Sequence, residues 1–445
     1  MSVDSKLALL KKAKDAVASS KAYSRLQLLF DEGSFVEIDG LAKSGEDYTE
    51  ALAGFGTVEG CPVYAFSQNS DIAGGAMSKA QAAKIRKVYD LAVKTGAPVV
   101  GLYDSKGARL QEGNEMLAAY GELLLNCNNL SGVVPQISVV LGPCLGTSAL
   151  LAVSADLVVM SADGELEIET NGADGSAERA EKSGMAHIVV PTEEEAIAQA
   201  KRLITMLPSN NLSVAPVADA EYAPEEQGED AILSVVDAGS FVELQKNYGA
   251  SALVGLARMS GDTVGVVAFK GLIDEESCAK AARTVRFCDA FALPVLTFVD
   301  SEGFASLKEA AKLTNAYAEA TTVKITVITG EAHGPLYTAV AGRGANADVT
   351  IAWPQASVSA LAPKTAVAFL WGDKLKGSAD PVTDREKLIA EYKETEASPL
   401  AAAAGGFIED VVAPEDTRAK LFALLDMMAG KRVSRLPKKH ANIQL

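Results

Sequence analysis

A short glycine turn between a predicted strand and a predicted helix is the first place where this chain could do chemistry. The β-branched run Ile137–Val140 predicts a strand buried on both faces, and the uncharged run Ala149–Val153 predicts a helix. Between them, Gly146 lets a ligand approach bare backbone, and Thr147 and Ser148 are suitable N-cap residues. Free N–H groups at a helix N-terminus can stabilise a developing oxyanion. The turn is a candidate oxyanion hole, although the same pattern also fits an ordinary strand–turn–helix with a packing glycine.

The chain contains this stretch twice, and the second copy is Val323–Trp353. The corresponding residues are Ile137–Val140 with Ile325–Ile328, Gly142 with Gly330, Gly146 with Gly334, and Ala155-Asp156 with Ala347-Asp348. Upstream, the corresponding segments are Pro98–Gly107 with Pro294–Gly303, and Gly33–Glu37 with Gly239–Glu243. Matches in the same order imply two tandem copies of one domain, each of roughly two hundred residues. We expect the first strand to end at Gly142-Pro143.

Length and composition bound the class of protein. The 445 residues suggest two or three domains, and 48% hydrophobic with 22% charged residues is typical of a globular protein. A net charge of −17 argues against nucleic acid or an anionic membrane as a general partner. The five cysteines have no paired spacing, which indicates reduced thiols in a cytosol. The first ten residues show no signal peptide, and glycines and prolines interrupt the uncharged run 123–155, so we expect a cytoplasmic protein without a transmembrane helix.

Apolar periodicity and cap residues predict helices around the two copies. They are expected at Ser5–Gln27, Ser78–Thr95, Thr192–Leu207, Asp274–Phe291, Lys308–Thr321, Ala362–Trp371, Thr383–Glu394 and Thr417–Gly430. A stretch rich in proline, alanine and acidic residues separates the copies and predicts a linker. The chain therefore divides into an N-terminal domain (1–215), a linker (216–230) and a C-terminal domain (231–445).

A polar glycine loop, Asp104–Arg109, follows the strand expected at Ala97–Tyr103. Because α/β folds place ligands at the carboxyl ends of buried strands, this loop is a second candidate source of N–H donors. Gly303 and Gly334 occupy the equivalent places in the second copy. The helix expected at Ser78–Thr95 carries four cations that are candidate phosphate ligands, namely Lys79, Lys84, Arg86 and Lys87.

Side chains for metal or nucleophilic chemistry are scarce. The only histidines are His187, His333 and His440, with no second histidine at ligand spacing, so no metal site is expected. The turn Gly146-Thr147-Ser148 lacks the Gly-x-Ser-x-Gly pattern of a nucleophile elbow. A duplicated backbone site without an obvious nucleophile favours stabilisation of an enolate or a similar oxyanion by backbone dipoles.

A set of short motifs runs from about residue 25 to the C-terminal end of the sequence. The motifs are Asp104-Ser105-x-Gly107-Ala108-Arg109, Gly132–Ser138, Gly142-Pro143-Cys144, Ser183–His187, Leu207–Asn211, Arg286–Leu296, Tyr317–Thr321, Ala352-Trp353-Pro354 and Pro437–His440. In this combination the chain resembles the carboxyltransferase subunit of biotin-dependent acyl-CoA carboxylases and sodium-pumping acyl-CoA decarboxylases. The resemblance implies an α/β fold of two tandem crotonase-like domains, each made of internally repeated ββα units, and this agrees with the repeat found independently.

The resemblance also implies a division of labour. The N-terminal domain would hold the acyl-CoA, and the C-terminal domain of a partner subunit would hold carboxybiotin on a separate biotin carboxyl carrier protein. Transferred by motif, the residues of the acyl-CoA hole are Gly107, Ala108, Gly146 and Thr147, and those of the biotin hole are Gly303 and Gly334. The residues expected to contact the coenzyme A thioester or the biotin are Gly74, Gly75, Lys106, Arg109, His333 and Leu336. Further implied partners are a biotin carboxylase or a membrane decarboxylase subunit, and the implied assembly is a hexamer built as a trimer of dimers.

Three departures from the family pattern keep other functions open. The family's Asp-Ser-Gly-Gly loop carries Lys106, the Gly-Gly after Gly-Pro-Cys-Ala becomes Gly146-Thr147, and Pro335 follows Gly334 in the second copy. Because proline has no N–H, the second hole cannot be built in the usual way. The main hypothesis is a carboxyltransferase acting on a small acyl-CoA. The alternatives are a non-catalytic or regulatory subunit of a biotin-dependent complex, and a biotin-independent CoA-thioester enzyme of the crotonase type.

Overall fold

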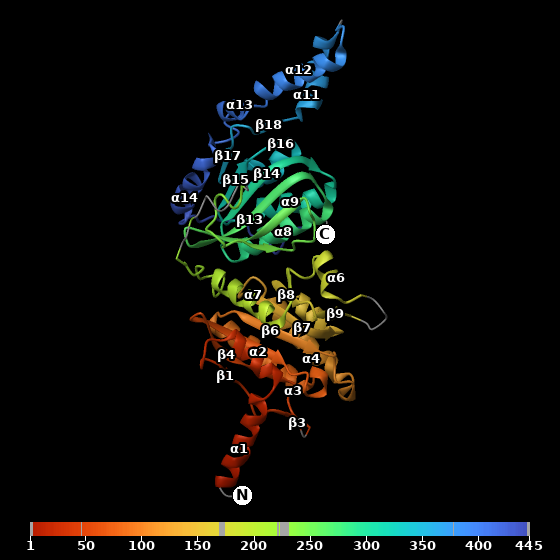
Figure 1. The fold of residues 1–445 in the computed structure, drawn as a ribbon, viewed down its shortest axis with the longest axis vertical. Coiled ribbons are helices and arrows are strands. Elements are labelled where there is room, and N and C mark those ends of the chain that lie inside the picture. Colours follow the sequence, from red (N-terminus) through yellow and green to blue (C-terminus); the bar gives the residue numbers. More distant parts are fainter. Residues whose placement is uncertain are drawn as a thin grey trace. The chain divides into compact units, whose positions relative to one another are not determined.

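The structure is a computed structural model that describes residues 3–45, 47–168, 174–219, 222, 231–376 and 378–442. The chain forms two compact units, Met1–Pro216 and Val217–Leu445 (Figure 1). Most of the predicted linker 216–230 lies outside the described residues. Among the helices that are described, none is long and apolar enough to cross a membrane.

The first unit is built on a mixed sheet with strand order β1-β4-β5-β6-β7-β8-β10, and β9 pairs with the end of β7. The strands are β1 (Val36–Glu37), β4 (Ala51–Val58), β5 (Cys61–Gln68), β6 (Val99–Ser105), β7 (Gln136–Leu145), β8 (Leu157–Ser161), β9 (Glu165–Glu167) and β10 (Ile188–Val190). The pairs from β5 to β10 are parallel, so their carboxyl ends meet at one edge of the sheet. The small hairpin β2 (Lys43–Ser44) and β3 (Asp47–Tyr48) stands apart from it.

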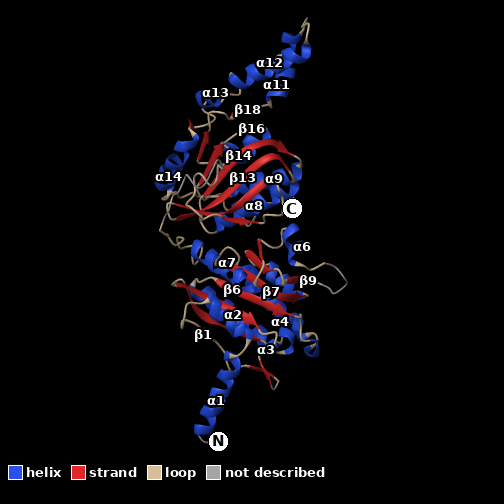
Figure 2. Ribbon diagram, in the orientation of Figure 1, coloured by secondary structure: helices blue, strands red, loops and turns tan. Residues whose placement is uncertain are grey.

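The second unit repeats this sheet with the order β11-β12-β13-β14-β15-β17-β19. The strands are β11 (Val242–Leu244), β12 (Ala252–Met259), β13 (Asp262–Ile273), β14 (Val295–Phe304), β15 (Lys324–Ile328), β17 (Val349–Ala352) and β19 (Asp410–Val411). A separate parallel pair is formed by β16 (Glu331–His333) and β18 (Ser357–Ser359). Figure 2 shows the long strands β13 and β14 together with the helices α8 and α9.

Helices cover the sheet of each unit, and the predicted caps fix several helix starts. In the first unit they are α1 (Val3–Ala18), α2 (Lys21–Leu29), α3 (Lys79–Thr95), α4 (Glu115–Leu130), α5 (Thr147–Val153), α6 (Ala177–Lys182) and α7 (Glu193–Met206). In the second they are α8 (Glu275–Ala290), α9 (Leu307–Glu319), α10 (Pro335–Val340), α11 (Pro363–Leu370), α12 (Pro381–Glu394), α13 (Pro399–Ala404) and α14 (Thr417–Met428). Ser78, Thr192 and Asp274 cap α3, α7 and α8 by accepting a backbone N–H in the first turn.

The duplication extends to individual hydrogen bonds. Asp31 accepts the N–H groups of residues 59 and 60 in the first hairpin, and Asp237 accepts those of residues 260 and 261 in the second. Asp156 accepts the N–H of Gln136 at 2.9 Å, and Asp348 accepts that of Lys324 at 2.8 Å. Equivalent carboxylates hold equivalent strand starts, so the two units share one architecture.

Two local predictions were wrong. The helix predicted at Ser5–Gln27 is two helices, because Ser20 caps a new helix and the chain turns at residues 19 and 20. The strand β7 does not end at Gly142-Pro143 but continues to Leu145, where pairing with β9 extends it. Proline has no N–H to donate, so the presence of Pro143 within β7 indicates that strand pairing does not need a donor at this position.

Candidate active site

The glycine turn of the first unit lies where β7 ends and α5 begins. Gly146 has φ 64° and ψ −132°, a conformation that favours glycine, and it takes the N-cap place that Thr147 or Ser148 was predicted to fill. Its N–H donates to the carbonyl of Glu167 at 2.7 Å. The N–H groups of Thr147 and Ser148 start the helix and have no acceptor within it. Gly146 therefore shapes the turn, and Thr147 offers the first available donor.

The 104–109 loop lies against this turn. A Cβ atom on Gly107 would come within 3.4 Å of the Leu145 carbonyl. The Gly107 N–H donates to Ser105 Oγ at 3.3 Å. The Met77 N–H donates to the Gly107 carbonyl, and the Arg109 N–H donates to the Met77 carbonyl, so the loop forms a short ladder with Met77. Ala108 lies between these bonded groups, and its N–H has no acceptor among the described residues. The predicted residues Gly107, Ala108, Gly146 and Thr147 are therefore brought together, and the N–H groups of Ala108 and Thr147 have no acceptor among the described residues.

Three more predicted residues gather on the outer side of this loop. Gly74 has φ 64°, and a Cβ atom there would lie 2.9 Å from Cδ of Lys106. The Lys106 N–H donates to the Gly74 carbonyl at 3.0 Å, and a Cβ atom on Gly75 would clash with the Asp104 carbonyl. A cavity of about 430 Å³ opens beside them, and its lining is Ala73, Ala76, Ala108, Arg109, Leu110, Gln111 and Glu112.

Cations predicted to bind phosphates are held by carboxylates of the protein. Arg109 donates to Ser44 Oγ at 2.8 Å and pairs with the fully buried Glu50 at 3.0 Å. The four cations of α3 form the pairs Lys79–Glu115, Lys84–Glu37, Arg86–Glu122 and Lys87–Asp39. Lys84 is itself buried, and burial lowers its pKa although Glu37 opposes this. These side chains are paired within the first unit, whereas Lys106 has no carboxylate partner among the described residues.

The equivalent turn in the second unit has the same backbone shape. Gly334 has φ 47° and ψ −116°, and its N–H donates to the Ser359 carbonyl at 2.9 Å, as Gly146 donates to Glu167. Pro335 then begins α10 without an N–H, so Leu336 is the first residue of the helix with an available donor. Gly303, the counterpart of Gly107, has φ 134° and donates to Ser301 Oγ at 3.3 Å.

His333 lies directly before the second turn and is 6% exposed. Its Nδ1 is 3.1 Å from Ser359 Oγ, whose single proton goes to the Leu361 carbonyl at 2.6 Å. Nδ1 must therefore carry the proton, which leaves Nε2 as a buried acceptor without a hydrogen-bond partner among the described residues, with Glu331 Oε2 4.0 Å away. Burial lowers the pKa of His333, while Glu331 raises it and Lys393 lowers it further. The second turn thus combines one backbone donor with one imidazole acceptor.

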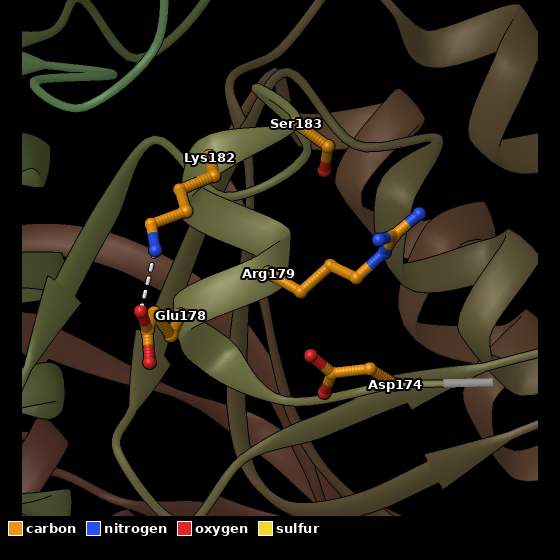
Figure 3. Close-up of a pocket in the computed structure, with 5 residues that line it drawn as sticks. All are labelled: Asp174, Glu178, Arg179, Lys182 and Ser183. Carbon is orange, nitrogen blue, oxygen red and sulfur yellow. Dashed lines mark hydrogen bonds and ion pairs between the residues drawn. The ribbon is translucent and has the colours of Figure 1, made fainter. Parts of the chain in front are cut away.

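A further pocket of about 400 Å³ lies at α6 and was not predicted from the sequence (Figure 3). Its lining is Asp174, Glu178, Arg179, Lys182 and Ser183. Lys182 and Glu178 form an ion pair on one side of the helix, and Arg179 and Asp174 lie on the other. These side chains are exposed, and none of them lies at the glycine turn.

The thiols do not supply a nucleophile. Burial raises the pKa of Cys127 and Cys288 to about 12, and it raises the pKa of Cys144, which belongs to β7, still further. Thiols with such pKa values are protonated and unreactive near neutral pH. These three thiols are therefore poor candidates for a nucleophile.

Backbone donors on a duplicated α/β unit fit the class of enzymes that act on thioesters through an oxyanion. The family model described as carboxyl transferase domain matches residues 18–443, and the chain belongs to this family. It is 36% identical to the carboxyltransferase subunit of propionyl-CoA carboxylase from Haloferax mediterranei, over 95% of this chain and 93% of that protein. It is 35% identical to the alpha subunit of methylmalonyl-CoA decarboxylase from Veillonella parvula, with the same coverage of both chains.

A solved structure of transcarboxylase 12S, with methylmalonyl-CoA and methylmalonic acid bound, has the same fold. Its TM-score is 0.92 at 30% sequence identity, and the match covers 100% of this chain and 99% of that one. A single-chain, multi-domain long-chain acyl-CoA carboxylase shares the fold at a TM-score of 0.81 and 23% identity, over 49% of its own length. The predicted family and the predicted fold of two tandem crotonase-like domains are confirmed.

Proposed function

We propose that this chain is the carboxyltransferase subunit of a biotin-dependent enzyme that moves a carboxyl group between carrier-bound biotin and a small acyl-CoA. The observation that carries the proposal is the pair of N–H groups on Ala108 and Thr147, which have no acceptor among the described residues and belong to a loop and a turn that lie in contact. Two convergent backbone donors stabilise the enolate oxygen of a thioester when it loses or gains a carboxyl group. No side-chain nucleophile is needed for that step.

The second turn fits the other half of this reaction. Carboxybiotin, when bound, supplies an activated carboxyl group on a cyclic urea, which has a carbonyl acceptor and an N–H donor. The Leu336 N–H is a donor for that carbonyl, and His333 Nε2 is an acceptor for an N–H of the ring. Gly303 and Gly334 shape the backbone around these two groups.

The relatives suggest the surroundings of this subunit. The solved transcarboxylase 12S is described as a hexamer, and we propose the same assembly for this chain. The carrier of the biotin, and a biotin carboxylase or a membrane decarboxylase subunit, are other chains. We propose a cytoplasmic location, with attachment to a membrane only through such a partner.

Pro335 favours a second candidate, a non-catalytic or regulatory subunit that keeps the fold. The two candidates are separated by CO2 release from malonyl-CoA and methylmalonyl-CoA with a biotinylated carrier. Turnover by the wild-type chain supports the carboxyltransferase, and its absence with every ester and a cognate carrier supports the scaffold. Decarboxylation that does not need biotin would instead support a crotonase-type thioester enzyme.

A further inference from the structure

Asp104 joins the two pieces of backbone that carry the donors of the first unit. It is the residue before the last of β6, where the 104–109 loop begins, and it is 6% exposed. A Cβ atom on Gly142, in the strand that leads to the glycine turn, would lie 2.7 Å from Asp104 Oδ1. Ser70 Oγ donates to Oδ2 at 2.8 Å. The position of this carboxylate therefore sets the distance between the loop and β7.

A buried arginine from α2 holds Asp104 in place. Arg25 is 2% exposed, and its NH1 donates to Asp104 Oδ2 at 2.8 Å. Its Nε and NH2 donate to the two oxygens of Glu193, at the start of α7, at 3.0 and 2.8 Å. The guanidinium is thus fixed by three hydrogen bonds in a planar geometry that an ammonium group cannot reproduce. Without it, a buried carboxylate would lack a cation.

A second buried pair holds the other end of the loop. Glu50 is completely buried beside β4, accepts a hydrogen bond from Ser78 Oγ at 2.6 Å, and pairs with Arg109 at 3.0 Å. Arg109 directly follows Ala108, whose N–H is a proposed donor. The loop is therefore held at both ends by charges that come from the segment before β5.

The second unit keeps the close approach of this carboxylate to the neighbouring strand, since a Cβ atom on Gly330 would clash with Asp300 Oδ1, but its described residues provide no buried cation for it. Asp300, the counterpart of Asp104, is exposed and accepts only the backbone N–H of Glu331 at 3.0 Å. The residue in the place of Arg109 is Ala305. A general requirement of the fold would appear in both copies, so the buried charges serve something particular to the first.

We propose that Arg25 and Glu50 are positioning residues for the acyl-CoA side of the reaction, acting through Asp104 and Arg109 to fix the Ala108 N–H opposite the Thr147 N–H. The inference rests on the proposed function and extends it to residues that touch neither substrate. Because a misplacement of about 1 Å can cost about 100-fold in rate, the loss is expected in kcat for the decarboxylation of methylmalonyl-CoA.

The test compares Arg25→Met, Arg25→Lys and Glu50→Gln with wild type in the full chain, measuring kcat, KM and thermal stability. We expect Arg25→Met to lower kcat about 100-fold with a KM changed less than about threefold, and Arg25→Lys to restore part of it. Lys21→Met is the matched control, because Lys21 pairs with the same Glu193 but is exposed and does not reach Asp104. It should leave kcat unchanged.

A merely structural role would lower the melting temperature while kcat per folded molecule stays within about twofold, and that result would overturn the proposal. If Arg25→Met does not fold, Asp104→Asn decides instead, since it keeps the shape of the side chain and removes the charge. An unchanged kcat in Asp104→Asn would equally overturn it. A failure of the proposed function is distinct, because the wild-type chain would then show no biotin-dependent CO2 release at all.

Discussion

At the scale of single residues, the two units differ at the position after the turn glycine. Thr147 begins α5 with an available N–H, and Pro335 begins α10 without one. The preceding glycines have nearly the same conformation, so the backbone accepts proline at this place. Pro335 therefore shows that this fold accepts a proline after the turn glycine, so the same change in the first turn can be used to remove one hydrogen-bond donor.

Thr147→Pro is expected to remove that donor from the first turn with little change in stability. Losing one oxyanion donor typically lowers kcat by about 10²- to 10³-fold. Thr147→Ser keeps the N–H and is the matched control. Steady-state kinetics with methylmalonyl-CoA, together with thermal melting, measure the effect. A kcat within about twofold of wild type in a folded Thr147→Pro protein would exclude this N–H from the reaction.

His333 is expected to make stability depend on pH below neutrality. Because burial lowers its pKa in the folded chain, the unfolded chain binds the proton first as the pH falls. The stabilising effect of the neutral ring is therefore complete above about pH 6.5 and is lost below it, down to the folded pKa. Urea unfolding of wild type and His333→Gln between pH 5 and 8 should diverge below pH 6.5. His440→Gln, at an exposed histidine, should follow wild type.

The sequence predicted the glycines of both turns but not the atoms that act. The repeat revealed Gly146 and Gly334, since equal spacing in two copies is visible without a structure. Their N–H groups are engaged because the short strands β9 and β18 fold back beside them. Arg25 was missed because its partner Asp104 lies 79 residues away, and no local pattern links the two.

At the scale of elements, the two units differ in the hydrogen bonds at the start of the strand that follows α4, which is β7, and of the strand that follows α9, which is β15. Gln136 donates to the Cys127 carbonyl at the end of α4, whereas the equivalent Lys324 donates to the Tyr317 and Ala320 carbonyls at the end of α9. Lys324 is 1% exposed. Burial, assisted by Lys431, lowers its pKa to about 8, while Asp348 and Asp289 oppose the shift.

Lys324→Gln, which copies the first unit, is expected to remove a pH dependence of stability. Between pH 8 and about 10.5 the unfolded chain binds more protons at Lys324 than the folded chain does. The free energy of unfolding therefore rises with pH over this range. Its limiting slope is about 1.4 kcal/mol per pH unit. Urea unfolding of the variant should show a flatter profile over this range. Parallel profiles would mean that Lys324 keeps its ordinary pKa.

Capped helices were the elements best predicted from the sequence. Ser78, Thr192 and Asp274 lie where the apolar periodicity begins, and the structure confirms helices after all three. The three-residue strands β9, β16 and β18 were not predicted, because each is held by pairing with a distant segment rather than by its own residues.

At the scale of the whole molecule, the proposed assembly predicts a definite mass. A hexamer would have six times the 46.3 kDa of the chain. Light scattering at micromolar concentration should find this mass, and the Phe369, Leu400 and Met427 side chains, which are exposed in the single chain, are candidates for the buried faces. A monomer at that concentration would contradict the assembly proposed here.

Subunit mixing tests whether the two turns of one active site come from different chains. Thr147→Pro damages the first turn, and Gly334→Ala damages the second because its Cβ would lie 2.8 Å from the Ala360 carbonyl at φ 47°. Each variant alone should be inactive. If sites form between subunits of a symmetric dimer, reassorted mixtures should regain about one quarter of wild-type activity. No recovery after verified subunit exchange would place both turns of a site in one chain.

Among the residues that the structure describes, the buried charges around the 104–109 loop have no counterpart in the second copy, and this has a consequence for the two halves of the proposed reaction. In the proposed reaction, carboxyl transfer consists of two half-reactions that share an intermediate, one with the thioester at the first turn and one with carboxybiotin at the second. Arg25 belongs to the first compact unit, and the second turn belongs to the other. A chain with Arg25→Met should therefore slow the thioester half-reaction and leave decarboxylation of carboxybiotin unaffected. Isotope exchange would be measured separately into the acyl-CoA and into carboxybiotin. We expect the two exchange rates to differ in the Arg25→Met variant and to be equal in the wild-type enzyme.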